Sequence, residues 1–246
     1  MTQPLYDTIG TGYASLRRAD PRIAAVIAAA LVDAQTVINI GAGAGSYEPP
    51  GRTILAVEPS ERMVAQRPKD AAPCVRAVAE YLPVKTAAAE AAMASLTIHH
   101  WPNWRAGLAE MRRIARRRVV LFTFDPDADL FWLTRDYVPA LAELDRKKMP
   151  KISDLAKELG PCTVKPVPIP HDCTDGFLGA YWRKPEAYLD AKLRSSMSSF
   201  ALIDSTAGLT KLAKDLDSGA WTKANAHLLT QDALDIGYRL LTWDFG

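Results

Sequence analysis

The feature that most constrains this chain is a β-branched stretch that runs directly into a glycine-rich turn. Residues 36–40 read Thr-Val-Ile-Asn-Ile, and Gly41-x-Gly43-x-Gly45 follows at once. β-Branched residues favour strands, and glycines at this spacing let the backbone turn tightly and approach a ligand closely. The pattern therefore predicts a strand of an open α/β sheet whose carboxyl end lies at a binding site.

The rest of the first half alternates between strands and helices. We expect further strands at 53–57, 74–78, 91–98 and 118–124. Helices are expected to begin after Asp20, Ser60 and Asn103, and the last of these has Trp104, Leu108, Met111 and Ala115 on one face. Alternation of this kind specifies an α/β fold, in which a parallel sheet is covered by helices on both faces.

The pattern changes after Asp125. Residues 126–150 are aromatic and mixed in charge, Ser153 begins a helix that ends at Gly160, and residues 163–170 form a proline-interrupted stretch typical of an edge strand. Residues 171–232 are helical, with Leu209, Leu212, Ala213 and Leu216 on one face, and residues 236–243 form a last strand. We expect one domain over 1–246, in which 1–125 hold a cofactor and 126–150 with 171–232 form a lid over the substrate.

Composition excludes several classes of protein. The 30 Lys and Arg residues nearly balance 28 Asp and Glu, and a net charge of +2 makes nucleic acid an unexpected partner. The longest apolar run, residues 23–32, is about half of the roughly 20 residues that a membrane-spanning helix needs. The charged residues after Arg17-Arg18 argue against an export signal, and Cys74, Cys162 and Cys173 show neither disulfide nor zinc spacing. We expect a cytoplasmic protein without a metal.

The glycine turn and the residue ending the second strand indicate the kind of cofactor. Glu58 follows the strand at 53–57, where a carboxylate can accept hydrogen bonds from both hydroxyls of a ribose. A dinucleotide-binding turn would have glycine in place of Ser46 and a helix for the pyrophosphate. Residues 46–52 contain two prolines and leave room for about one helical turn, and Glu48 would repel phosphate. A cofactor with ribose but no phosphate, S-adenosylmethionine (SAM), fits better than NAD.

At this level of detail the chain resembles the class I SAM-dependent methyltransferases of the small-molecule type. Five blocks within about residues 5–125 carry the resemblance in the expected order. They are 13–17 (Tyr-Ala-Ser-Leu-Arg), 37–45 with the glycine turn, 57–60 (Val-Glu-Pro-Ser), 79–83 (Ala-Glu-Tyr-Leu-Pro) and 95–101 (Ser-Leu-Thr-Ile-His-His-Trp). The resemblance implies a Rossmann-like, mostly parallel seven-stranded sheet with helices on both faces and an antiparallel last strand, with a helical lid inserted late.

The resemblance also implies SAM as the methyl donor and S-adenosylhomocysteine (SAH) as the product. Tyr13 and Arg17 would reach the donor's amino-acid part, and Arg17 would pair with its carboxylate. The residues implied to bind the donor are Tyr13, Arg17, Asn39, Gly41, Ala42, Gly43, Gly45, Glu58, Pro59, Ser60, Met63, Ala79, Glu80, Leu82, Ser95 and His99.

The chain departs from the family pattern at three places. Asn39 stands where an acidic residue usually helps to hold the donor's ammonium, and it supplies no charge. Val78 stands where an aspartate commonly bonds the adenine amine, so Glu80 or the backbone would take that role. Arg116-Arg117-Arg118 replace the usual turn before the fifth strand. The adenine contacts are therefore open.

Methyl transfer is an in-line displacement, so holding the acceptor on axis supplies most of the catalysis. A base is needed only where the acceptor must lose a proton. His171, next to Asp172 and Asp175 in a turn, is the first candidate for that base, and His100 is the second. We expect His99 to pack against the donor. The residues expected to contact substrate are Trp132, Tyr137, Asp172, Asp175 and Tyr181.

The leading hypothesis is a methyltransferase acting on the nitrogen, oxygen or carbon of a small organic molecule. A second is an RNA or protein methyltransferase that uses the basic cluster of Arg112, Arg113, Arg116, Arg117 and Arg118. An NAD-dependent oxidoreductase is a more remote alternative, and a SAM-binding protein without catalysis is another. The sequence leaves the acceptor and the oligomeric state open.

Overall fold

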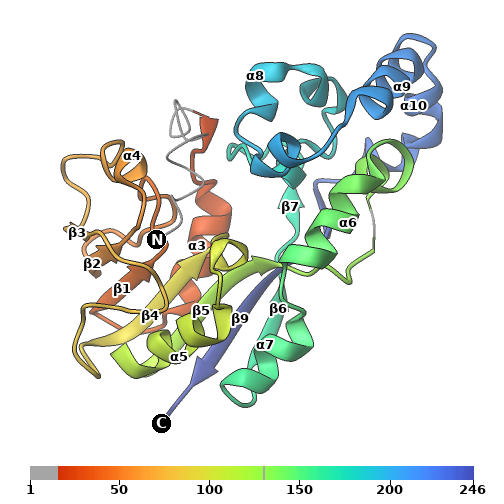
Figure 1. The fold of residues 1–246 in the computed structure, drawn as a ribbon. Coiled ribbons are helices and arrows are strands. Elements are labelled where there is room, and N and C mark those ends of the chain that lie inside the picture. The colour runs from red at the N-terminus through yellow and green to blue at the C-terminus, as the bar shows by residue number, and fades with distance from the viewer. Residues whose placement is uncertain (1–15, 130) are drawn as a thin grey trace.

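A seven-stranded sheet forms the centre of the molecule (Figure 1). The structure is a computed structural model and describes residues 16–129 and 131–246. The strand order is β3-β2-β1-β4-β5-β9-β6, and the sheet is parallel except for β9, which runs antiparallel to both of its neighbours. The strands are β1 (Val37–Ile40), β2 (Thr53–Val57), β3 (Cys74–Val75), β4 (Ala89–Ser95), β5 (Ala115–Phe124), β6 (Thr163–Pro166) and β9 (Tyr238–Asp244). The predicted Rossmann-like fold with an antiparallel last strand is confirmed.

Helices cover both faces of this sheet. Alternate side chains of β5 point to opposite faces: Val119 and Leu121 join one apolar core and Val120 and Phe122 the other. The first core lies against α5 (Trp104–Ile114) and α7 (Ile152–Glu158), and the second against α3 (Pro21–Ala30). Asp20 caps α3 by accepting a hydrogen bond from the Arg22 amide. α4 (Glu61–Val64) is a single turn capped by Ser60.

A helical insertion lies between β7 (Ile169–Pro170) and β8 (Ala233–Leu234), which pair with each other in a small separate sheet. It contains α8 (Ala191–Arg194), α9 (Thr206–Asp217) and α10 (Ala220–Ala224), and in Figure 1 it lies beyond one end of the main sheet, next to α6 (Pro139–Lys148). Residues 126–150 pack against the insertion through an aromatic core. In this core the Trp132 ring packs edge-on against Tyr137, Tyr188 and Trp221. Residues from 126–150 and 171–232 therefore form one packed unit.

Several predicted boundaries were wrong, and each has a local cause. α5 ends at Ile114 and β5 begins at once, because Ala115 already pairs with Ala89 of β4, so Ala115 is not helical as expected. β4 ends at Ser95, because Leu96 adopts φ +52° and a turn of 3-10 helix, Ile98–His100, follows. The stretch at 163–170 is divided between β6 and β7. Within the described residues, no helix is both long and apolar enough to cross a bilayer.

Candidate functional site

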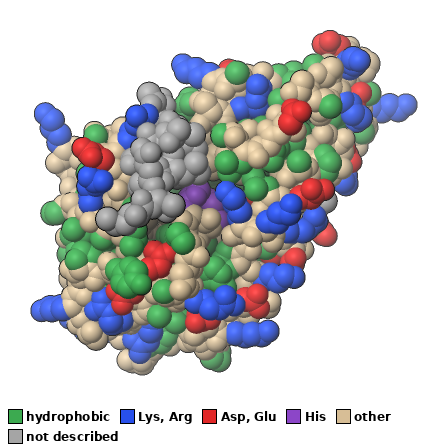
Figure 2. Space-filling view, viewed as in Figure 1, with side chains coloured by type: hydrophobic (Ala, Val, Ile, Leu, Met, Phe, Trp, Pro, Cys, Tyr) green, Lys and Arg blue, Asp and Glu red, His purple; other side chains and the backbone are tan. Residues whose placement is uncertain are grey.

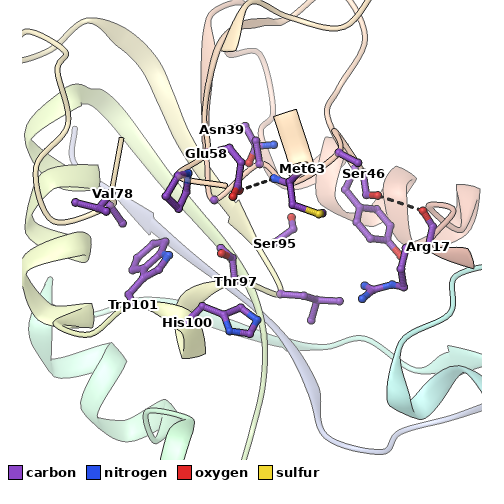
Figure 3. Close-up of a pocket in the computed structure, with 18 of the residues that line it drawn as sticks. Arg17, Asn39, Ser46, Glu58, Met63, Val78, Ser95, Thr97, His100 and Trp101 are labelled. Carbon is purple, nitrogen blue, oxygen red and sulfur yellow. Dashed lines mark hydrogen bonds between the residues drawn. The ribbon is translucent and has the colours of Figure 1, made fainter. Parts of the chain in front are cut away.

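The main cavity lies where the carboxyl ends of β1, β2 and β4 meet, as predicted from the glycine turn. Its volume is about 240 Å³. Figure 3 shows Asn39 and Glu58 on one side of it, Thr97 and His100 on the other, and Arg17 at one end. Of the predicted donor-binding residues, those that line this cavity are Arg17, Asn39, Gly41, Ala42, Gly43, Glu58, Pro59, Met63, Ala79, Glu80 and Ser95.

Other predicted residues do not line this cavity. Gly45, Ser60 and Leu82 are not among its lining residues, and Ser60 and Leu82 make local hydrogen bonds instead. The Ser60 hydroxyl accepts a hydrogen bond from the Met63 amide at 3.2 Å, which starts α4. The Leu82 amide donates to the Glu110 carboxylate at 2.8 Å. Tyr13 lies outside the described residues.

Gly41 lines the main cavity at a position where any side chain would clash. Its φ is +65°, and a Cβ at this position would lie 2.2 Å from the Thr97 hydroxyl oxygen. The turn after β1 can therefore approach the segment after β4 this closely only because Gly41 has no side chain. Thr97 lines the same cavity, although the sequence did not identify it.

Glu58 is fixed by backbone donors on both sides. The Gly43 amide donates to Oε2 and the Ser60 amide to Oε1, each at 2.9 Å, and the residue is only 6% exposed. An ionised carboxylate has about four acceptor positions, and the two amides fix the orientation of the Glu58 carboxylate at the main cavity. The geometry suits a vicinal diol such as the one in a ribose.

Asn39 is held by a charge network that the sequence did not reveal. Its Nδ2 donates to Glu48 Oε1 at 3.1 Å, and Glu48 is paired with Arg67 at 2.8 Å. Asn39 Oδ1 is buried and accepts no hydrogen bond within the described residues. Because Asn39 lines the cavity, this oxygen is an acceptor available to a ligand's N–H group. Glu48, expected only to repel phosphate, instead orients Asn39.

The end of the main cavity opposite Arg17 is apolar (Figure 3). Val78, Ala79 and Trp101 line it, and Val78 is 41% exposed. Glu80 also lines it, but its Oε1 already accepts a hydrogen bond from the Asn103 amide at 3.0 Å, ahead of α5. A flat apolar group such as a purine ring fits between these side chains.

A second cavity, of about 80 Å³, adjoins the first, since Arg17 and Leu96 line both. Its other walls come from the ends of β5 and β9 and from the helical insertion, and they include Phe124, Phe177 and Tyr238. His99, predicted to pack against the donor, lines this second cavity, whereas His100 lines the first. The two neighbouring rings, with centroids 3.9 Å apart, thus face different cavities.

Both histidines are neutral near pH 7. Burial is the main cause: it lowers the pKa of His100 to about 4 and that of His99 well below its ordinary value. The positive charges of Lys148 and Arg17 add to the effect on both rings. His99 Nδ1 is buried and has no hydrogen-bond partner among the described residues. A neutral imidazole can donate or accept a hydrogen bond but carries no charge here.

Arg17 lies at the junction of the two cavities in an ion pair that the sequence did not predict. Its Nε contacts Asp175 Oδ1 at 2.6 Å, and the Tyr47 hydroxyl donates to Asp175 Oδ2 at 2.7 Å. Asp175 was expected to contact substrate, but it is 1% exposed and lines neither cavity. Its position makes it a support for Arg17, because burial leaves no surface for a ligand.

The other predicted substrate-contacting residues also lie away from both cavities. The predicted base His171 faces the Asp232 carbonyl oxygen at 3.2 Å, and Asp172 forms an exposed ion pair with Arg22 at 2.7 Å. The hydroxyl of Tyr137 donates to Asp215 in α9. Trp132 and Tyr181 pack in the aromatic core of the insertion, where their ring edges contact Tyr188. These two aromatic side chains therefore stabilise the packed unit formed by 126–150 and 171–232.

Asp145 is the most informative residue that the sequence reasoning missed. It lies on the buried side of α6 with Leu141 and Ala142, and it lines the second cavity. Its carboxylate makes no hydrogen bond or ion pair within the described part of the chain, and the residue as a whole is 8% exposed. Burial raises its pKa to about 7, against the opposing effect of Lys148. The sequence did carry a signal for it, because Asp145 is an acidic residue at a position where the helical pattern expects an apolar one.

The described residues contain no group of three or more His, Cys, Asp or Glu that could hold a metal ion. The groups that line the two cavities include the fixed carboxylate of Glu58, neutral imidazoles, the Arg17 guanidinium and aromatic rings.

Comparison with known proteins identifies similar domains. A family model described as a methyltransferase domain matches residues 38–123. A crystal structure from Anabaena variabilis ATCC 29413, assigned as a methyltransferase from an antibiotic biosynthesis pathway, is 32% identical to the chain. It superposes with a TM-score of 0.84 and covers 93% of this chain and 99% of its own. A comparison with curated protein sequences gives no match.

Two more distant structures share the fold. A SAM-dependent methyltransferase from Thermotoga maritima is 20% identical, with a TM-score of 0.55, and covers 67% of this chain and 84% of its own. Geranyl diphosphate C-methyltransferase from Streptomyces coelicolor A3(2), solved in complex with Mg²⁺, a substrate analogue and SAH, is 12% identical, with a TM-score of 0.54. That match covers 91% of this chain and 75% of the Streptomyces protein.

Proposed function

The chain belongs to the class I SAM-dependent methyltransferases, and we propose that it transfers a methyl group from SAM to a small organic acceptor. Members of this family use SAM as methyl donor. The observation that carries the proposal is the junction of the two cavities at Arg17 and Leu96. In-line displacement needs donor and acceptor on opposite sides of one methyl group, and two adjoining cavities supply that arrangement.

In this proposal the main cavity holds the donor. Glu58 accepts the ribose hydroxyls, the apolar end around Val78 and Trp101 takes the adenine, and Asn39 Oδ1 accepts from the donor's ammonium. Arg17 lies near the opposite end (Figure 3). The ion pair with Asp175 orients the Arg17 guanidinium, and in this proposal the guanidinium pairs with the donor's carboxylate.

We propose that the packed unit from 126–150 and 171–232 forms the acceptor side. Phe177 and Met197 come from the second of these segments and line the second cavity, as Phe131 does from the first. A cavity of about 80 Å³ has room on the order of several water molecules, which favours a small molecule over a folded macromolecule as the acceptor. The three cysteines are free thiols, which supports a reducing compartment such as the cytoplasm.

The alternative of RNA or protein methylation has less support, because ion pairs occupy much of the arginine cluster. Arg113 pairs with Glu110, Arg117 with Asp33 and Glu90, and Arg118 with Asp244. Figure 2 shows basic and acidic side chains interspersed on the visible face. Paired cations contribute little to phosphate binding, which depends on a surplus of positive charge.

Removal of the Glu58 carboxylate tests the donor site. Glu58→Ala should weaken SAH binding about 100-fold, since two hydrogen bonds to a charged group contribute roughly 1.5 kcal/mol or more each. Isothermal titration calorimetry with SAH measures this directly. Glu61→Ala, which removes an exposed carboxylate on α4, is the matched control and should bind SAH like the wild type.

Glu58 also holds two backbone amides, so the variants need a check on folding. Glu58→Gln retains one acceptor oxygen and should lose less affinity than Glu58→Ala at similar thermal stability. Failure of the wild-type protein to bind SAH or SAM at millimolar concentration would overturn the proposed function.

A further inference from the structure

Two polar groups of the second cavity have no partner among the described residues. His99 Nδ1 is buried without a hydrogen-bond partner. The Asp145 carboxylate belongs to a residue that is only 8% exposed, and no ion pair or hydrogen bond joins it to the described residues. Unpaired polar groups are rarely left buried, because each loses its bonds to water. Two in one small cavity indicate that a ligand completes their hydrogen bonding.

The charges around this cavity favour a cation. Arg17 also lines it, but its positive charge is opposed by Asp175, which lies within 2.6 Å. His99 is neutral, since burial lowers its pKa well below the ordinary value. Lys148 is exposed, one turn of α6 beyond Asp145. Among the described lining residues, Asp145 thus bears the one carboxylate, and no cation is paired with it.

The remaining walls suit the same kind of ligand. Phe124, Phe131, Phe177 and Tyr238 come from four different segments and surround the cavity. Aromatic faces attract ammonium groups and also contact the alkyl chain that carries them. A carboxylate in an aromatic enclosure is poorly suited to an anionic ligand, because like charges repel and the one cation among the described lining residues, Arg17, is paired with Asp175.

We propose that the second cavity binds a small alkylammonium acceptor, and that Asp145 pairs with its ammonium and takes the proton that the nitrogen must lose. This inference rests on the proposed function, whose donor site lies across the Arg17–Leu96 junction. The acceptor is a primary or secondary amine of a few carbons, or the amine-bearing end of a longer molecule.

The proton and electron balance is complete without a further reactant. The ammonium gives one proton to the Asp145 carboxylate and becomes a neutral amine with a free lone pair. That pair attacks the methyl carbon, the C–N bond forms as the C–S bond breaks, and the electrons of the C–S bond remain on sulfur. The products are SAH and the methylated ammonium, and Asp145 later returns its proton to water.

The pH dependence of methylation follows from the surroundings of Asp145. The groups around it are Lys148 on α6, Tyr238 on β9, His99 after β4, and Arg17 with its partner Asp175. Burial dominates and raises the pKa of Asp145 to about 7. Because the ionised form takes the proton, kcat/KM for an amine should rise as pH increases through about 7. Asp145→Asn should lack this rise.

The binding experiment uses the SAH-saturated protein and three probes of matched shape: n-butylamine, 1-butanol and butyrate. Saturation with SAH is established first, so a failure of donor binding is recognised as a failure of the proposed function alone. Ligand-observed NMR at pH 8 then gives the affinity for each probe. Wild-type protein should bind the amine at least tenfold more tightly than the alcohol and should exclude butyrate.

Two variants on the same helix identify the group responsible. Asp145→Asn should abolish the preference for the amine, whereas Glu143→Gln, the same change at an exposed position of α6, should keep it. Equal binding of alcohol and amine, tighter binding of butyrate, no detectable amine binding, or a preference that survives in Asp145→Asn would each overturn the inference.

Discussion

Asn39 illustrates how a residue that differs from its family pattern can have a compensating charge beside it. The negative charge expected at this position lies instead on Glu48, whose Oε1 accepts the hydrogen bond from Asn39 Nδ2. Arg67 stabilises that carboxylate by contacts of 2.9 and 2.8 Å. The amide group of Asn39 is thereby fixed in orientation, with its oxygen left for a ligand.

This arrangement predicts that restoring the usual acid would be harmful. Asn39→Asp would place a carboxylate oxygen about where Nδ2 now lies, 3.1 Å from Glu48 Oε1, and like charges at that distance repel. We expect SAH affinity to fall several-fold in calorimetry. The double variant Asn39→Asp/Glu48→Gln should recover at least the lost affinity, and tighter binding by the single variant than by wild type would contradict this explanation.

Asp145 also affects the stability of the fold. Its pKa in the folded protein, about 7, lies above the ordinary 3.8. Between these two pH values the folded protein keeps a proton that the unfolded chain has lost. The free energy of unfolding therefore decreases as pH rises through this window and stays lower above it.

Asp145→Asn removes this dependence, because an amide does not ionise in the window. Between pH 5 and pH 8 the wild type should lose roughly 2–3 kcal/mol of unfolding free energy relative to the variant. Urea unfolding at the two pH values measures the difference. Parallel behaviour of the two proteins would show that the buried carboxyl does not titrate near neutrality.

At the level of elements, the position of α6 depends on how its neighbours pack. The π-helical turn Leu133–Tyr137 leads into α6 and contacts α9. Gly208 of α9 lies against the backbone of Tyr137, where a Cβ would be 2.1 Å from the carbonyl oxygen. α9 therefore supports the turn that sets the start of α6, and through it the location of Asp145.

Gly208→Ala tests this mechanical link. The added methyl group should push α9 away from the Leu133–Tyr137 turn and lower stability by about 1–3 kcal/mol, as overpacking commonly does. SAH affinity should stay unchanged, because no residue of α9 or α6 lines the main cavity. Binding of n-butylamine should weaken. Thr210→Ala, on the exposed side of α9, is the control; equal stability of Gly208→Ala and wild type would contradict the prediction.

The elements also show which signals a sequence carries reliably. The strand at 37–40 and the caps Asp20, Ser60 and Asn103 were correctly identified, because β-branching and side-chain capping act within a few residues. Ser153 was wrong as a helix start, since α7 begins at Ile152 without a side-chain cap. The end of β4 was missed, because φ +52° at Leu96 has no glycine or asparagine to mark it. The next residue, Thr97, lies against Gly41, which is distant in the sequence.

For the whole molecule, the two sides of the site differed in how well they could be predicted. Most residues expected at the main cavity line it, because they follow strand ends of one sheet and strand ends converge. The residues that line the second cavity, the proposed acceptor side, were mostly not identified from the sequence. Trp132 and Tyr181 were chosen because they are aromatic, yet they pack inside the insertion, and Asp145 was passed over. Which face of an insertion meets a sheet depends on contacts distant in sequence.

The pairing of β7 with β8 has a consequence for exchange of the segment between them. Ile169 pairs with Leu234 and Pro170 with Ala233, so the intervening 62-residue segment (171–232) leaves and returns at the same point. Changing the length of such a closed excursion costs little, because closure entropy grows only slowly with the number of residues. Exchange of that segment would leave every described residue lining the main cavity in place and would have to preserve one contact, the ion pair of Asp175 with Arg17.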